Sequence, residues 1–370
     1  MARKVITAFL QTSAGQPQQT LSIAARCNAL RSRAFTSTTL KAAVAHPITA
    51  HGPPPEAPLP SPGSESATQH EENKGTTQEG EPQPRQLKRP TVSKKRFWKN
   101  VDVQKNQDEY QVLLDKRPVR TPSKSILSVP PTKPYLAHAI ALEWDVMNTA
   151  QQALRNHVIP LTSLTARATD IVQEDAVGEL IARDQIVQTA MRYLDTDTLL
   201  CWEPEKEEHA LGVDRIGQKR ETLREAQVRV AQDIIAFLST KVWPGIDIVP
   251  VLDTDSIFPA SQSQDTKDVI RQWIQGLDAH DLAALERGIL ASKSLLIAVR
   301  LVTDWSENFR HLQRQGLKKF GIEEAAEASS LEVRWQTEQW GEVEDTHDVN
   351  KEDLRRQLGS VIVLVSGETK

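Results

Sequence analysis

The chain has 370 residues, with 45 lysines and arginines against 49 aspartates and glutamates, which gives a formal net charge of −4. Residues 1–35 contain five basic residues and no acid, so the remainder carries 40 basic against 49 acidic residues, a formal charge of −9. This balance argues against a general nucleic-acid binder, which needs a positive face. No apolar run approaches the roughly 20 residues of a membrane span. We therefore expect that the protein has no nucleic-acid partner and that it is not a membrane protein.

The N-terminal segment has the composition of a mitochondrial transit peptide. The first acidic residue is Glu56, and the segment before it is rich in Ser, Thr, Ala and Arg. Such a positive, acid-free segment is drawn by the inside-negative membrane potential. Arg33 lies two residues before the bond that follows Phe35, as at processing sites. We predict a transit peptide over residues 1–35 and a mitochondrial matrix location; the alternative is a tail that targets nothing.

Residues 36–95 are predicted to form a disordered linker. They contain no Phe, Trp or Tyr, and from His51 to Lys95 the chain consists mainly of Pro, Gly, Ser, Glu and Gln. A stretch of this kind buries too little apolar area to offset the loss of backbone entropy on folding.

Cysteine usage fits a reducing compartment. The sequence has two cysteines, and Cys27 would leave with the transit peptide, so Cys201 has no partner for an internal disulfide. Because no Cys/His cluster surrounds Cys201, we expect no zinc site.

Residues 96–155 are predicted to form a small β-rich domain with one helix. The runs FWKNVDVQ and EYQVLLD are short and β-branched with a polar turn between them, and SILSVP indicates a further strand limited by prolines. After Thr132 the period changes, since Leu136, Ile140 and Trp144 recur at four-residue spacing. This spacing predicts a helix with one apolar face, for which Thr132 is the expected N-cap.

Residues 156–370 are predicted to form an all-helical domain. Amphipathic segments follow one another there, separated by Gly, Pro or Asp clusters, and residues 246–252 are a possible strand within an irregular segment. The fold class is therefore α+β, with a small β-rich N-terminal domain followed by a multihelical C-terminal domain. The expected helices cover residues 161–172, 176–194, 218–238, 266–276, 281–305 and 323–341.

One cluster of residues has the chemistry of an active site. The acids Glu342, Glu344, Asp345 and Asp348 lie close to His347 in the sequence, and acids with a histidine can bind a metal or transfer protons. The alternative is a solvated helix end and turn, where Asp and Glu are common. The sequence has no Gly-rich phosphate loop, Walker motif or G-x-S-x-G turn. With no second histidine in range, we expect no metal, no cofactor and no enzymatic activity.

A basic run lies beside Tyr110. Lys116, Arg117, Arg120 and Lys124 could contact phosphate, which would suit an RNA-associated matrix protein. The alternative is a charged hairpin edge that discourages strand-to-strand aggregation.

Tryptophan is unusually frequent, with eight residues against three tyrosines and seven phenylalanines. We expect Trp98, Trp144 and Trp335 to be structural, because tryptophan in an amphipathic segment normally belongs to a core. An exposed tryptophan would instead be suited to anchor a protein partner, because tryptophan is enriched at the energetically important positions of protein interfaces.

Six sequence motifs occur along the chain in a fixed order. They are RFWKNVDVQ, YQVLLDKRPVRTPSKSILSVP, LAHAIALEWD, IPLTSLTARATD, YLDTDTLLCW and EASSLEVRWQTEQWGE. Together they are similar to the mitochondrial ATP synthase assembly chaperones that bind the alpha subunit, the assembly factor 2 family, over about residues 96–345. Lys116 is a departure, because the family usually has glycine after the aspartate of that hairpin turn.

The resemblance implies a matrix chaperone without catalytic activity. It implies that the partner is the unassembled ATP synthase alpha subunit, which is kept from aggregating until the beta subunit docks. The motif QTEQWGE then suggests a partner-binding edge at Glu338, Trp340 and Glu342, with Asp348 beside it. Two alternatives remain open at this point: a matrix hydrolase using Glu342, His347 and Asp348, and an RNA-associated matrix protein.

Overall fold

The computed structural model describes residues 95–205, 221–252, 258–313, 316 and 318–368. The predicted transit peptide and linker, residues 1–35 and 36–95, lie almost entirely outside these residues, and both stay predictions. No helix among the described residues is long and apolar enough to cross a membrane.

The first folded element is a small antiparallel sheet. Strand β1 (Val101–Lys105) pairs with β2 (Tyr110–Leu114), with Val103 opposite Val112. Strands β3 (Arg117–Pro118) and β4 (Ser128–Val129) both pair with β2. Side chains alternate along β2, so its buried residues Tyr110, Val112 and Leu114 face the core.

The tight turn after β2 explains why lysine is accepted at position 116. The positive φ of this turn, 58°, falls on Asp115 and not on Lys116. Aspartate tolerates this left-handed conformation better than most residues. Its Oδ1 accepts hydrogen bonds from the amides of Lys99 (3.1 Å) and Asn100 (3.0 Å), and the latter bond is the main reason that its pKa is lowered. The side chain therefore ties the turn to the chain that enters β1.

Helix α1 (Pro134–Asp145) packs against β1 and β2. It begins one residue later than expected, because the N-cap is Lys133 and not Thr132. The hydroxyl of Thr132 instead donates a hydrogen bond to Glu307, 175 residues away (3.0 Å). Pro134 starts the helix without a side-chain cap, because its fixed φ already suits the helix and its missing N–H would have had no partner within the helix.

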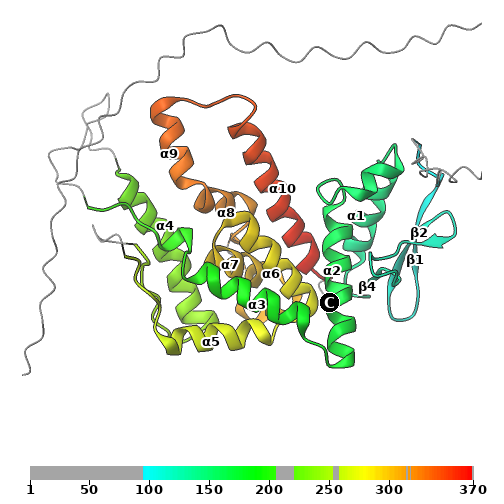
Figure 1. Cartoon of the computed structure of the whole chain (residues 1–370), viewed down its shortest axis with the longest axis horizontal. Coiled ribbons are helices and arrows are strands. Elements are labelled where there is room, and N and C mark those ends of the chain that lie inside the picture. The colour runs from blue at the N-terminus through cyan, green and yellow to red at the C-terminus, as the bar shows by residue number, and fades with distance from the viewer. Residues whose placement is uncertain (1–94, 206–220, 253–257, 314–315, 317, 369–370) are drawn as a thin grey trace, which may run out of the picture. The chain divides into compact units, whose positions relative to one another are not determined.

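Most of the rest of the described chain is helical, as predicted, and Figure 1 shows the arrangement. The central pair, α6 and α7, packs closely, and α10 and α2 both contact α6. The helices are α2 (Pro160–Val177), α3 (Ile181–Leu194), α4 (Leu223–Phe237), α5 (Gln264–Gln275), α6 (Ala279–Ser292), α7 (Leu295–Trp305), α8 (Ile322–Ser329), α9 (Leu331–Trp340) and α10 (His347–Val365). Short helical turns occur at Ala150–Leu154, Thr198–Leu200, Leu238–Val242 and Glu307–Leu312.

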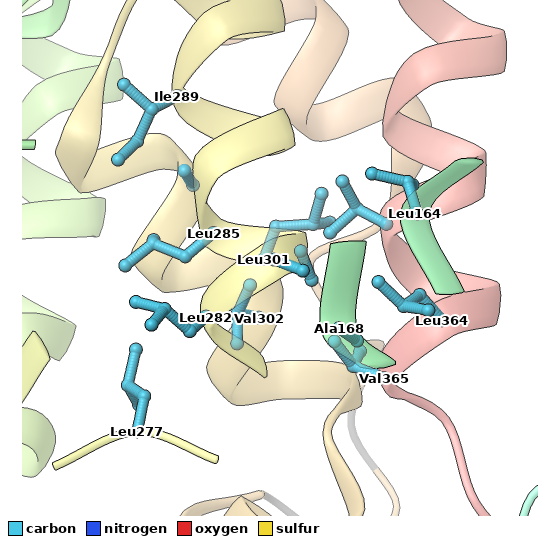
Figure 2. Packing of buried hydrophobic residues seen from close by; sticks show 14 of the residues in the cluster. Leu164, Ala168, Leu277, Leu282, Leu285, Ile289, Leu301, Val302, Leu364 and Val365 are labelled. Carbon is cyan, nitrogen blue, oxygen red and sulfur yellow. The ribbon is translucent and has the colours of Figure 1, made fainter. Parts of the chain in front are cut away.

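The core lies where α2, α6, α7 and α10 meet (Figure 2). Gly288 on α6 allows this close approach, because a Cβ there would lie 3.0 Å from the Cβ of Ala298 on α7 and 3.9 Å from Val361 on α10. Any larger side chain would push these helices apart. Figure 2 shows Leu164 and Ala168 of α2 and Leu364 of α10 beside Leu301 of α7.

Two expected helices are each divided. The segment 281–305 breaks after α6, where Lys293 adopts φ 59° and Ser294 caps α7 by accepting a hydrogen bond from the Ile297 amide (3.1 Å). The segment 323–341 breaks at Ser330, between α8 and α9. The amphipathic spacing continues through both breaks. A prediction from periodicity alone therefore treats each pair of helices as one.

Two further expectations were incomplete. Residues 347–365 form α10, although no helix was predicted there. The possible strand at 246–252 is reduced to a single bridge between Cys201 and Leu252.

Candidate partner-binding surface

The surface predicted to bind a partner lies where α9 ends and α10 begins. We call residues 338–349 the α9–α10 tip. Trp340, the last residue of α9, is 78% exposed, and Val343 and Val349 are also largely exposed. Exposed apolar side chains that gather on one surface are typical of interaction sites, whereas single ones are common on any protein.

Helix α9 is held in place by a small cluster of its own. Leu331 is buried and Trp335 half-buried against Leu223, Ala226 and Val230 of α4. The i,i+4 pair Leu331 and Trp335 therefore faces inward, but toward α4 and not toward the central core. This anchoring fixes the direction in which the end of α9 points, so that Trp340 is displayed on a supported helix.

The tip is strongly acidic. Residues 338–348 contain five acids and no lysine or arginine. Glu338, Glu342 and Asp348 are all exposed. The Oε1 atom of Glu338 lies 3.7 Å from Nε of Arg334, which is one helical turn earlier on α9. An exposed tryptophan surrounded by carboxylates suits a partner surface with both apolar and basic side chains.

The backbone of the tip is ordered by local contacts. The Val343 amide donates a hydrogen bond to Nδ1 of His347 (3.0 Å), so this ring nitrogen is unprotonated and Nε2 carries the hydrogen of the neutral ring. Gly341 and Asp345 supply the positive φ values of the turn, 88° and 58°. The turn is therefore a defined structure in which His347 has a structural contact.

The hydrolase alternative needs Glu342, His347 and Asp348 to converge. Glu342 and Asp348 are exposed, and His347 uses one ring nitrogen to bind the backbone. Among the described residues, no group of three or more His, Cys, Asp or Glu side chains has the arrangement of a metal site. One hollow of about 320 Å³, lined by α3 residues and Arg271, and another of about 300 Å³, lined mainly by residues of α4 and α8, do not include these three side chains.

Two buried carboxyl groups with raised pKa values belong to other parts of the molecule than the tip. Asp197 is fully buried, and this burial raises its pKa to about 6. Its carboxylate accepts hydrogen bonds from the amides of Leu199 (3.0 Å) and Leu296 (3.1 Å), which joins a helical turn to the start of α7. Asp281 is also buried with a raised pKa, and it accepts hydrogen bonds from Ser306 and Asn308. Asp197 therefore closes helix ends, and Asp281 ties α6 to the turn that follows α7; both contacts are structural uses.

Trp98 and Trp144 lie together at the junction of the sheet and α1. Trp98 is buried, and its ring centroid lies 5.3 Å from that of the half-buried Trp144. The Trp98 indole donates to the Trp144 carbonyl (3.2 Å), and the Trp144 indole donates to Thr162 Oγ1 on α2 (3.1 Å). The pair thus connects the sheet region with α2.

The basic side chains of the hairpin are exposed. Lys116, Arg117, Arg120 and Lys124 are all exposed, and Arg120 donates to the Lys124 carbonyl (2.7 Å). Tyr110 is 9% exposed and faces the core, so it offers no platform on which a base could stack.

Comparison with known proteins gives the family. Residues 95–239 match the family described as ATP12 chaperone protein. The mitochondrial protein atp12 of Schizosaccharomyces pombe is 32% identical over 276 residues, which cover 74% of this chain and 83% of the relative. The chain belongs to the ATP12 chaperone family. The mitochondrial ATP12 protein of Saccharomyces cerevisiae is 29% identical over 292 residues, covering 76% of this chain and 86% of that protein.

Solved structures of ATP12 proteins share the fold. The crystal structure of Atp12 from Paracoccus denitrificans has a TM-score of 0.52 at 23% identity, and the match covers 73% of this chain and 97% of that one. A putative chaperone from Agrobacterium tumefaciens has a TM-score of 0.53 at 21% identity, covering 73% of this chain and 85% of that one. The resemblance noted from the six motifs is confirmed, and so is the α+β fold class.

Proposed function

We propose that this ATP12-family protein is an assembly chaperone of the mitochondrial ATP synthase, acting in the matrix on the unassembled alpha subunit. In this proposal it binds the alpha subunit through the α9–α10 tip and prevents aggregation until the beta subunit docks. It does so without catalysis, because covering an apolar surface requires only reversible binding. The N-terminal segment, residues 1–35, serves as the transit peptide that directs the protein to the matrix.

The observation that carries the proposal is the exposure of Trp340 within an acidic tip. A tryptophan that is exposed to solvent does not contribute the stabilisation that it would give the fold if it were buried in the core. Membership of a chaperone family supplies a reason for that exposure, since a chaperone must present an apolar surface to its client. The carboxylates of Glu338, Glu342 and Asp348 would steer a client with basic residues and add little to affinity when exposed.

The test uses the full chain and purified alpha subunit. Binding is measured by pull-down, and suppression of alpha-subunit aggregation by light scattering. We expect Trp340→Ala to weaken binding at least tenfold, and Glu338→Lys or Glu342→Lys to weaken it less and in a salt-dependent way.

Matched controls separate the tip from general surface effects. Tyr135→Ala removes an aromatic side chain of similar exposure, 75%, from α1, and Asp108→Lys reverses an exposed charge in the turn between β1 and β2. Both should bind the alpha subunit normally. Each variant is checked by circular dichroism for retained fold. Undiminished binding by Trp340→Ala and both lysine variants would discard the tip as the client site, and no binding of alpha subunit by the unmodified chain would discard the function.

A further inference from the structure

A second exposed apolar surface lies at the turn between α2 and α3. We call Val177, Leu180 and Ile181 the α2–α3 corner. Their exposed fractions are 72%, 46% and 59%, and Ala176 beside them is also exposed. In Figure 1 this turn follows the lower end of α2. Three large aliphatic side chains are therefore exposed within five residues of the chain, which is more than a single exposed leucine.

The corner is rigidly held. Gly178 ends α2 with φ 78°, and the Glu179 amide donates back to the Glu174 carbonyl (2.9 Å), the hydrogen bond of a Schellman-type helix end. The Glu174 carboxylate accepts a hydrogen bond from the Ala182 amide in the first turn of α3 (2.7 Å). Because both helix ends are closed by these bonds, the apolar side chains are displayed in a fixed arrangement, which lowers the entropic cost of binding a partner.

The residue at the start of α3 is poor for local stability. Leu180 occupies the N-cap position and makes no side-chain cap hydrogen bond. Serine, threonine, aspartate or asparagine there typically stabilises a helix by about 1 kcal/mol relative to an apolar residue. Leucine is a poor N-cap residue, and here it is also exposed to water. This combination indicates that Leu180 serves a purpose other than the stability of the fold.

The charge around the corner selects the partner. Residues 170–184 contain five acids and one arginine, a formal charge of −4. The arginine, Arg183, is turned inward: it pairs with Asp175 and donates to the carbonyls of Gln275 and Leu277 (both 2.9 Å). Glu179 and Asp184 are exposed beside the apolar side chains. Lys124 lies in the loop whose Ser123 and Ser125 donate hydrogen bonds to Asp170 and Gln173 of α2, and Arg192 and Arg271 line the same hollow as Asp184.

We propose that the α2–α3 corner is a protein-docking surface for a cationic amphipathic helix of a partner protein. Apolar side chains of that helix would cover Val177, Leu180 and Ile181, while its lysines or arginines face Glu179 and Asp184. The acidic charge disfavours two other occupants: a second copy of the chain would bring like charges together, and an anionic lipid surface would be repelled. The surface is distinct from the α9–α10 tip, so the proposal goes beyond the function proposed above and does not depend on it.

The experiment uses the full chain and a synthetic amphipathic helix of leucine and lysine, about five turns long. The peptide carries a photo-crosslinking group, and its affinity is measured by fluorescence anisotropy. We expect crosslinks within residues 174–184. We also expect Leu180→Ser and Glu179→Lys each to weaken binding about tenfold. A peptide with glutamate in place of lysine should not bind.

Leu180→Ser separates binding from folding. Because serine is a better N-cap than leucine, the unfolding temperature of this variant should be unchanged or raised while its affinity falls. Leu142→Ser, at a leucine of α1 that is 62% exposed, and Trp340→Ala at the tip serve as controls and should leave the crosslinks at the corner in place. Crosslinks confined to other surfaces, or affinity unchanged in Leu180→Ser, would overturn the proposal.

Discussion

The two ends of α10 differ in almost every property. Its C-terminal half is part of the core, where Leu358, Val361 and Leu364 are fully buried. Its N-terminal end belongs to the α9–α10 tip, where Asp348 and Val349 are exposed. One continuous helix thus joins a closely packed region to an open, acidic one. The arrangement teaches that the tip is displayed by a rigid element whose stability comes from the opposite end.

Three changes test what the closely packed region and the open tip each contribute to stability, and the one with the largest expected effect concerns Lys133. Its ammonium is buried against Glu307 (2.8 Å) and the Val365 carbonyl at the end of α10 (2.8 Å). Lys133→Ala leaves Glu307 without its cation, which should lower the free energy of unfolding by about 3–5 kcal/mol. The measurement is urea unfolding followed by circular dichroism.

A double variant checks the cause. Adding Glu307→Ala to Lys133→Ala should restore part of the lost stability, because the uncompensated buried charge is then gone. Equal stability of Lys133→Ala and the unmodified protein would show that this contact does not hold the end of α10.

The second change concerns Asp197, whose pKa is raised to about 6 by burial. Between pH 6 and 4 the folded state binds this proton while the unfolded state, with its ordinary pKa near 3.8, does not. Stability from this group therefore rises as pH falls from 6 to 4, by an amount on the order of 2–3 kcal/mol. Asp197→Asn should lose this pH-dependent contribution. The measurement is the free energy of unfolding in urea of both proteins at each pH, and the difference between the two proteins should change between pH 6 and 4. A difference that is constant with pH would contradict the assignment.

The third change compares one substitution at both ends of α10. Val361→Ala removes buried methyl groups and should cost about 2 kcal/mol, whereas Val349→Ala, at a side chain that is 56% exposed, should change stability by less than about 0.5 kcal/mol. Thermal unfolding of the two proteins gives the comparison. Similar losses in both would mean that the tip is packed against something that the structure does not place there.

The sequence predicted the type of most elements correctly but not their limits. Strands at 101–114 and helices such as α2 and α5 follow from strong periodicity. By contrast, α10 was missed, because its first half is charged and its apolar residues gather only toward its end. A helix of this composition owes its stability to packing against α6, a partner that lies some sixty residues earlier in the chain and leaves no local pattern.

Trp335 and Trp340 show where sequence reasoning about the candidate site ends. Both occur on α9, five residues apart, in the motif that carried the resemblance to the family. The spacing predicts that Leu331 and Trp335 lie on the same face of a helix. It does not predict which part of the protein this face packs against. In the folded protein Trp335 contacts α4 and is half-buried, whereas Trp340 extends past that contact and is 78% exposed.

The sequence by itself determined the α+β class, the helical character of the long C-terminal region and the family. These follow from periodicity and motif order, which are local and additive properties of the chain. The tertiary structure alone decided that Lys133 is buried beside Glu307, that Asp197 joins two helix ends, and that the tip and the α2–α3 corner stay open. Burial depends on segments brought together from distant parts of the chain, and no window of local sequence contains that information.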